Sequence, residues 1–234
     1  MKMPSFFKKY LDRGSISVNP LCSEFEVGKS RVSEFVIQQL VPIVGVTPFP
    51  LDELMLMVST ICRFSPTHIF EWGTHVGKSA RIFHEANRKF GVGAEIHSID
   101  LPDDVQHVEH PGHKRGELVR HIKEVRLHQG DGVAKFLEIY AGCGEGCRPL
   151  IFLDGDHDYQ TVKRELDTIF SKVKEPTVLL HDTFYQSAES GYNVGPHRAI
   201  MDTLPTLPPS YQAMSLSMGL PGMTLLYRSG PVSP

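Results

Sequence analysis

Residues 67–80 read "THIFEWGTHVGKSA", and two different patterns meet within them. A short apolar run ends at a turn with glycines at 73 and 77, and a helical pattern over 77–90 follows. Glycine lets the backbone bend tightly and approach a ligand, and the first turn of a helix offers free N–H groups. The stretch therefore predicts a buried strand, a turn able to meet a ligand, and a helix.

Similar apolar runs recur along the chain, and helical stretches separate most of them. The expected strands lie at 67–72, 94–100, 125–129, 149–154 and 177–182. The expected helices between them lie at 77–90, about 113–123, 132–140 and 158–172. Strands that alternate with helices indicate a mostly parallel sheet covered on both faces.

The C-terminal end breaks this alternation. Two further apolar runs, 211–218 and 223–229, flank the short turn "GLPG" at 219–222, which is typical of a β-hairpin. We therefore predict an α/β fold: a Rossmann-like sandwich with a mostly parallel seven-stranded sheet, a C-terminal antiparallel hairpin, and helices on both faces.

The N-terminal part has a different organisation. Residues 30–40 have helical spacing, Pro48 and Pro50 interrupt the chain, and a second helix is expected at 51–64. We predict an N-terminal helical arm over 1–50 and a ligand-binding domain over 51–234. The arm should pack over the ligand side of the sheet or against another subunit, so a homo-oligomer is expected.

Composition excludes several classes of protein. The 234 residues are 41% hydrophobic and 22% charged, as in ordinary globular proteins. A formal net charge of −3 argues against nucleic acid as the main partner. Four cysteines are too few for a disulfide framework, and neither a signal peptide nor an apolar run of about 18 residues is present. We expect a cytoplasmic protein with no membrane partner.

Three successive strand ends carry glycine turns or acids, the pattern expected of a nucleoside pocket. After the turn at Gly73, the second strand ends at Asp100, an acid that can accept both hydroxyls of a ribose. The third strand ends in Gly130-Asp131-Gly132, where Asp131 can cap the next helix or accept the amino group of an adenine. Trp72 belongs either to the core or to the pocket wall.

At these positions the chain resembles the class I S-adenosylmethionine-dependent methyltransferases, in particular small-molecule O-methyltransferases. "FEWGTHVGKSA" (70–80), "IDLP" (99–102) and "GDG" (130–132) are similar to that family's first turn, ribose-binding acid and adenine-side turn. The resemblance covers about residues 50–230. It implies that 51–234 is an S-adenosylmethionine-binding domain that methylates a hydroxyl of a sugar or natural product. The implied cofactor-binding residues are Glu71, Gly73, Thr74, Gly77, Ser79, Asp100, Leu101, Asp131 and Gly132.

A D-G-D-H motif within "FLDGDHDY" (152–159), with "VLLHDT" (178–183), resembles the metal-dependent antibiotic-sugar methyltransferases. Asp154 and Asp182 end strands that lie about 4.8 Å apart if adjacent, so their carboxylates can share one ion such as Mg²⁺. The resemblance implies Asp154 as a catalytic metal ligand and His157 as the base. His181 is a further candidate ligand, and since Mg²⁺ prefers oxygen it leaves the metal's identity open.

Other features favour simpler interpretations. Asp158 is expected to begin the helix at 158–172. Cys143 and Cys147 have the wrong spacing for the usual zinc pair, so the sequence favours a tight loop before the fourth strand. The loops 101–118 and 183–197 are expected to build the site of a small-molecule acceptor.

Two rival functions remain at this level, and within the methyltransferase interpretation the acceptor atom can also be a nitrogen or a carboxylate oxygen. A nicotinamide-dependent oxidoreductase can use a similar sheet, although the third glycine of its fingerprint is missing and the terminal hairpin argues against it. A non-catalytic nucleoside-binding module would keep the pocket, although Asp154, His157 and Asp182 argue against that reading.

Overall fold

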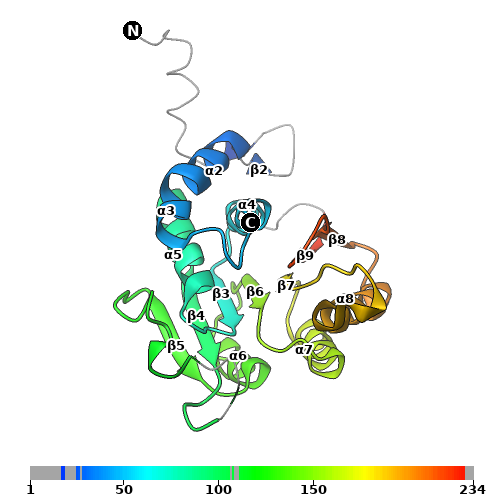
Figure 1. The fold of residues 1–234 in the computed structure, drawn as a ribbon. Coiled ribbons are helices and arrows are strands. Elements are labelled where there is room, and N and C mark those ends of the chain that lie inside the picture. Colours follow the sequence, from blue (N-terminus) through cyan, green and yellow to red (C-terminus); the bar gives the residue numbers. More distant parts are fainter. Residues whose placement is uncertain (1–16, 19–24, 27, 106, 108–110, 230–234) are drawn as a thin grey trace, which may run out of the picture.

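A computed structural model describes residues 17–18, 25–26, 28–105, 107 and 111–229. Seven strands form one sheet in the order β5-β4-β3-β6-β7-β9-β8 (Figure 1). They are β3 (His68–Trp72), β4 (Glu95–Asp100), β5 (Val125–Gln129), β6 (Pro149–Leu153), β7 (Thr177–His181), β8 (Tyr211–Leu216) and β9 (Met223–Arg228). Strands β3 to β7 pair in parallel, and β9 runs antiparallel to both β7 and β8. The predicted sheet and its reversed C-terminal hairpin are confirmed.

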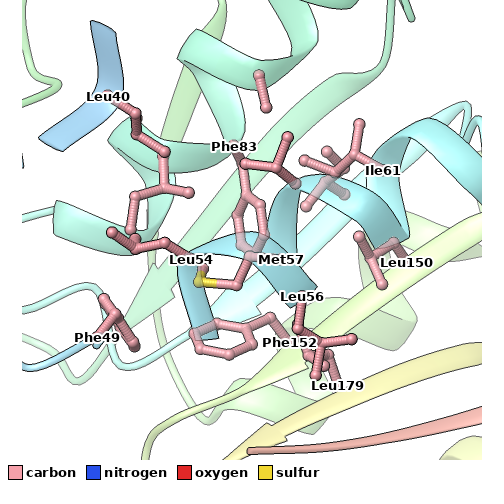
Figure 2. Packing of buried hydrophobic residues seen from close by; sticks show 14 of the residues in the cluster. Leu40, Phe49, Leu54, Leu56, Met57, Ile61, Phe83, Leu150, Phe152 and Leu179 are labelled. Atoms are coloured by element: carbon pink, nitrogen blue, oxygen red, sulfur yellow. The ribbon is translucent and has the colours of Figure 1, made fainter. Parts of the chain in front are cut away.

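Helices cover both faces of this sheet (Figure 1). The main ones are α4 (Leu51–Phe64), α5 (Lys78–Phe90), α6 (Gly132–Tyr140), α7 (Tyr159–Lys172) and α8 (Val194–Thr203). One apolar cluster joins α4 and α5 to one face of the sheet, and a second joins α6, α7 and α8 to the other. Figure 2 shows the first cluster, in which Met57 of α4 and Phe83 of α5 meet Phe152 of β6.

Two predicted segments were wrong. The helix expected at about 113–123 is a 3₁₀ turn over Gly112–Lys114 followed by further turns, because Gly112 and Gly116 adopt left-handed φ values of 57° and 62°. The segment 183–197, expected to be a loop, already contains the start of α8 at Val194.

The N-terminal segment packs into the main core. Helix α2 (Lys29–Phe35) continues through a π-helical turn (Val36–Leu40) into α3 (Val41–Val44). Its buried side chains belong to the same cluster as α4 and α5 (Figure 2). Farther upstream, β1 (Ser17–Val18) pairs with β2 (Phe25–Glu26). The rest of the expected arm, residues 1–16, 19–24 and 27, lies outside the described residues, and the boundary at residue 50 stays a prediction.

Within the described part of the chain, no helix combines the length and the apolar character needed to cross a bilayer.

Candidate active site

The turn after β3 lies directly against the end of β6. Gly73 has a φ of 93°, and a Cβ added there would lie 1.9 Å from the carbonyl oxygen of Asp154. Any side chain at this position would therefore separate the two strand ends. The strand order reverses between β3 and β6, and in open α/β sheets ligands bind beside such a reversal, at the carboxyl ends of the strands.

A chain of buried polar groups lies behind this turn. Ser98 donates a 2.5 Å hydrogen bond to Glu71 Oε1, and the Thr74 hydroxyl lies 2.6 Å from Ser98. Burial raises the pKa of Glu71 to about 7, although the hydroxyls of Ser79 and Ser98 oppose that rise. Its other oxygen, Oε2, has no partner in hydrogen-bonding geometry among the described residues. The carboxyl therefore keeps one acceptor beside the glycine turn.

Asp100 is held rigidly at the end of β4. The backbone N–H groups of His75 and Leu101 donate to its two oxygens at 3.0 and 2.8 Å. Arg115 Nε lies 3.5 Å from Oδ2, so this guanidinium partly covers the carboxylate. The sequence did not single out Arg115, because it comes from the segment whose structure was predicted incorrectly. A ribose at Asp100 would lie next to Arg115.

The third strand end has structural contacts of its own. Asp131 accepts the N–H of Ala134 as the cap of α6, and its other oxygen lies 3.2 Å from Arg164. Gly132 leaves space for Trp72, because a Cβ there would lie 2.5 Å from the indole ring. Trp72 is buried in the core, where its Nε1–H donates to Glu165 at 3.0 Å. The capping reading of Asp131 thus has direct support, while its contact with an adenine stays a prediction.

Asp154, His157 and Asp182 come together at the carboxyl ends of β6 and β7. One ligand atom from each lies within 4.8 Å of the others, as a shared metal ion would require. His157 Nε2 lies 2.9 Å from Asp182 Oδ2, and its ring stacks on Tyr192 with centroids 3.9 Å apart. Asp158 caps α7 as expected, accepting the N–H groups of Gln160 and Thr161.

His181 occupies a different place in the site than the sequence suggested. Its Nδ1 lies 3.0 Å from Asp154 Oδ1 and 3.1 Å from Asp182 Oδ2, while Nε2 lies 3.1 Å from Glu53 Oε2. Burial lowers its pKa, but the carboxylates, Asp154 foremost, outweigh burial and raise it to about 12. A protonated imidazole does not bind metal. His181 as a ligand stays a prediction, and the geometry favours His157 as the third donor.

These contacts also set the charge of the two aspartates. Burial favours a raised pKa at Asp182, but hydrogen bonds from His157 and His181 outweigh it and lower the pKa to about 2. Burial raises the pKa of Asp154, and His181 opposes that rise.

Glu53 was missed by sequence reasoning because it looked like an ordinary acid in the first turn of α4. It also accepts the N–H of Gly222 at 2.9 Å, which ties α4 to the hairpin.

The sequence pattern of one protein family, described as a methyltransferase domain, matches residues 70–183 of the chain. The match begins in β3 and ends just after Asp182, so it contains every predicted site residue. Residues 70–183 therefore form a methyltransferase domain. This match and the reversed last strand favour a methyltransferase over the nicotinamide oxidoreductase.

Solved structures share the fold of this methyltransferase at low sequence identity. An O-methyltransferase from Bacillus cereus in complex with SAH is 14% identical to this chain, with a TM-score of 0.55. The alignment covers 86% of this chain and 90% of the Bacillus cereus chain. The O-methyltransferase TomG from Streptomyces achromogenes, in complex with SAM, is 16% identical, with a TM-score of 0.53. The alignment covers 97% of this chain and 95% of TomG. A structure named cmcI with Mg and SAM is 14% identical, with a TM-score of 0.50. The alignment covers 76% of this chain and 72% of the cmcI chain. No curated protein matches the chain.

Proposed function

We propose that this methyltransferase transfers a methyl group from S-adenosylmethionine to a hydroxyl oxygen of a small molecule, of sugar or natural-product type. The observation that carries the proposal is the group of Asp154, His157 and Asp182 beside the Gly73 turn. A hydroxyl is a poor nucleophile until its proton is removed, and an imidazole held by a carboxylate is a suitable base near neutral pH.

The residues present fit the cofactor. Asp100 points its fixed carboxylate toward the place expected for ribose hydroxyls, and each of its oxygens can accept a second hydrogen bond. Glu71, buried directly behind the glycine turn and bonded to Ser98, would support that turn from within the core. When bound, S-adenosylmethionine supplies an electrophilic methyl group on a sulfonium. The chain's own task is then to position the acceptor and remove its proton.

The donor set also fits a divalent ion, in keeping with the Mg and SAM named for the cmcI structure. Asp154, His157 and Asp182 would hold it, and it would lower the pKa of a hydroxyl bound to it. His157 would then be a ligand and not the base. Two carboxylates suit Mg²⁺, whereas an imidazole ligand favours a transition metal such as Mn²⁺. If no ion binds, His157 held by Asp182 remains as a base in its own right.

The acceptor would approach past Tyr192, whose ring covers His157. Tyr185, also exposed, stacks on His197 of α8 at a centroid distance of 4.8 Å. These two exposed aromatic rings would provide flat apolar surfaces against which a sugar or polycyclic acceptor can pack.

Two measurements test this function separately. Calorimetry should show S-adenosylhomocysteine binding that Asp100→Ala weakens by about 1.5–3 kcal/mol, the range for a hydrogen bond to a charged group. A screen of hydroxylated small molecules with methyl-labelled cofactor, run with EDTA, Mg²⁺ or Mn²⁺, should identify an acceptor. With that acceptor, His157→Ala should keep cofactor binding and lose roughly 10²–10⁴-fold in turnover.

The outcomes distinguish the rivals. Tighter binding of NADH than of S-adenosylhomocysteine would support an oxidoreductase. Cofactor binding without methyl transfer to any acceptor class would support a non-catalytic module. Turnover that is unchanged by EDTA would remove the ion and leave the pair His157–Asp182 as the base.

A further inference from the structure

A second group of side chains able to bind a metal lies at the amino ends of the central strands β3 and β6. His68 is the first residue of β3, Cys147 precedes β6 by two residues, and Cys143 follows α6 closely. Asp154 lies beyond the other end of β6, and four residue steps at about 3.3 Å separate the ends of this strand by roughly 13 Å. The group is therefore distinct from the candidate active site.

The separations between these side chains suit a tetrahedral ion. Ligand atoms of His68, Cys143 and Cys147 all lie within 4.8 Å of one another. Cys147 Sγ is 3.4 Å from His68 Nδ1. Zinc lies about 2.3 Å from sulfur and about 2.0 Å from nitrogen, so a tetrahedral angle puts these two ligand atoms about 3.5 Å apart. The two ligand atoms therefore already have the separation that an ion needs. The Thr67 hydroxyl, 3.0 Å from His68 Nδ1, would have to turn its hydrogen away when the ion binds.

Backbone hydrogen bonds hold both ligand-bearing segments in place. Thr67 N–H donates to the carbonyl of Arg148 at 3.0 Å, and Arg148 N–H donates to Thr67 Oγ1 at 2.9 Å. These two bonds fix the residues that immediately precede His68 and follow Cys147. Within the loop, Cys147 N–H donates to Gly144 at 3.0 Å and Cys143 N–H to Tyr140 at 3.0 Å. The spacing of Cys143 and Cys147 differs from that of the usual zinc pair, but the fold brings a third ligand, His68, to them from more than seventy positions upstream.

A neighbouring histidine belongs to a second group that could compete for an ion, since His97 Nε2 lies 3.8 Å from Glu95 Oε2. His97 is only 2% exposed, and its Nε2 has no hydrogen-bond partner among the described residues. With Glu95 it forms a second three-residue group around the same His68. This second group contains no sulfur, so it would bind an ion with a different spectroscopic signature.

We propose that His68, Cys143 and Cys147 bind one divalent ion of the zinc class, with a water in the fourth position. Binding would release the two thiol protons to solvent, since thiolates are the ligands. The ion would tie the loop between α6 and β6 to the amino end of β3, so its role is structural. All three side chains are partly exposed, so an ion can reach them from solvent.

Cobalt provides the test, because Co²⁺ substitutes for zinc and absorbs in the near ultraviolet when bound to a thiolate. The full-length chain, reduced and freed of metal, is titrated with Co²⁺ and then with Zn²⁺. One equivalent of Co²⁺ should give the thiolate band, and Zn²⁺ should abolish it. Cys143→Ser, Cys147→Ser and His68→Gln should each weaken Co²⁺ binding at least tenfold, with folding checked by circular dichroism.

Two controls separate this site from the rest of the molecule. Cys62→Ser changes a buried thiol of α4 outside the group, and it should leave the cobalt band intact. The double variant Asp154→Asn, Asp182→Asn removes the sulfur-free active-site group and should also retain it. Thermal unfolding of the unaltered chain supplies a measurement that needs no variant, and one equivalent of Zn²⁺ should raise its midpoint.

Three results would overturn the proposal. The first is a folded, reduced chain that gives no thiolate band and no Zn²⁺-dependent rise in midpoint. The second is Co²⁺ binding without a sulfur band, which would place the ion at His68, Glu95 and His97. The third is a Cys143–Cys147 disulfide, found by mass spectrometry of the chain purified without reductant, that persists when Zn²⁺ is present at equilibrium with a thiol buffer.

Discussion

At the level of single residues, the buried cation of His181 holds the site together. Three carboxylates, from Glu53, Asp154 and Asp182, surround one imidazole that is only 4% exposed. Buried charges of one sign are costly unless a partner of opposite sign is present. In the absence of an ion, His181 supplies that partner.

His181→Gln should therefore destabilise the chain by about 3–5 kcal/mol, the usual cost of removing one partner of a buried ion pair. Urea unfolding in EDTA measures this loss. If Asp154, His157 and Asp182 bind a divalent ion, Mn²⁺ should restore much of the lost stability, because it replaces the missing positive charge. His121→Gln, at an exposed histidine, is the control and should change little. A loss that Mn²⁺ leaves untouched would argue against the ion.

A second buried carboxyl makes stability depend on pH. Burial raises the pKa of Glu165 to about 7, well above its ordinary value of 4.5. Between pH 4.5 and 7 the folded chain then binds more protons than the unfolded chain, so stability falls as pH rises through this window. The effect of this one group is up to about 3 kcal/mol, and it is complete above pH 7.

Glu165→Gln should remove the contribution of Glu165 to this dependence and make the chain more stable at pH 8 than the natural sequence. The amide keeps an oxygen that can accept the Trp72 N–H. Urea unfolding followed by the fluorescence of Trp72, the single tryptophan, measures the slope between pH 5 and 8. Part of the slope should remain, because the pKa of Glu71 is also raised to about 7. Glu117→Gln, at an exposed position, should leave the slope unchanged; a variant at Glu165 that does the same would refute the assignment.

The sequence predicted which residues form the site, but it did not predict which other residues contact them. The carboxyl ends of β6 and β7 carry Asp154 and Asp182 because strand ends can be read from apolar runs, and adjacent strands place them side by side. Glu53 and Arg115 could not be found in this way. Each comes from a segment whose approach to the site depends on tertiary packing, and a single sequence contains no periodic signal for that.

At the level of elements, the sequence predicted the ends of the strands better than the start of helix α8. The strand boundaries were predicted within two residues. For the buried parallel strands β3, β6 and β7 the reason is that such strands appear as uninterrupted apolar runs. The start of α8 was missed because Gly195 and Pro196 look like loop residues. Its glycine is needed for close contact: a Cβ at Gly195 would lie 2.0 Å from the carbonyl oxygen of His157. Helix α8 therefore supports the loop that carries the proposed base.

Gly195→Ala tests that role, and the sign of its effect is diagnostic. Alanine favours a helix by about 0.8–1 kcal/mol over glycine, so the change would stabilise the chain if nothing lay nearby. Contact with the His157 backbone should instead destabilise it by about 1–3 kcal/mol and reduce methyl transfer. Thermal unfolding and turnover measure the two effects. Met201→Ala, on the exposed side of α8, should change neither; a stabilised Gly195→Ala with full turnover would show that α8 does not constrain the loop.

At the level of the whole molecule, the predicted division at residue 50 crosses a continuous core. Phe35 of α2 is 2% exposed and meets Phe90 of α5 edge to face, with ring centroids 5.4 Å apart. The sequence showed that residues 30–40 form a helix, but an amphipathic stripe does not state which partner covers it. In the structure that partner is the same helical layer that covers β3 and β6.

If the N-terminal helices fold together with the sheet, Phe35→Ala should lower the stability reported by Trp72 of β3. The expected loss is about 3–5 kcal/mol, as for other buried phenylalanines replaced by alanine, with an unchanged dependence on urea concentration. Ile37→Ala, at a neighbouring side chain that is 60% exposed, should cost far less. Circular dichroism and Trp72 fluorescence should then report one coincident transition, because helix and sheet unfold as a unit. An arm that folds separately would instead give an early helical transition in Phe35→Ala, while the Trp72 midpoint stayed where it is in the natural sequence.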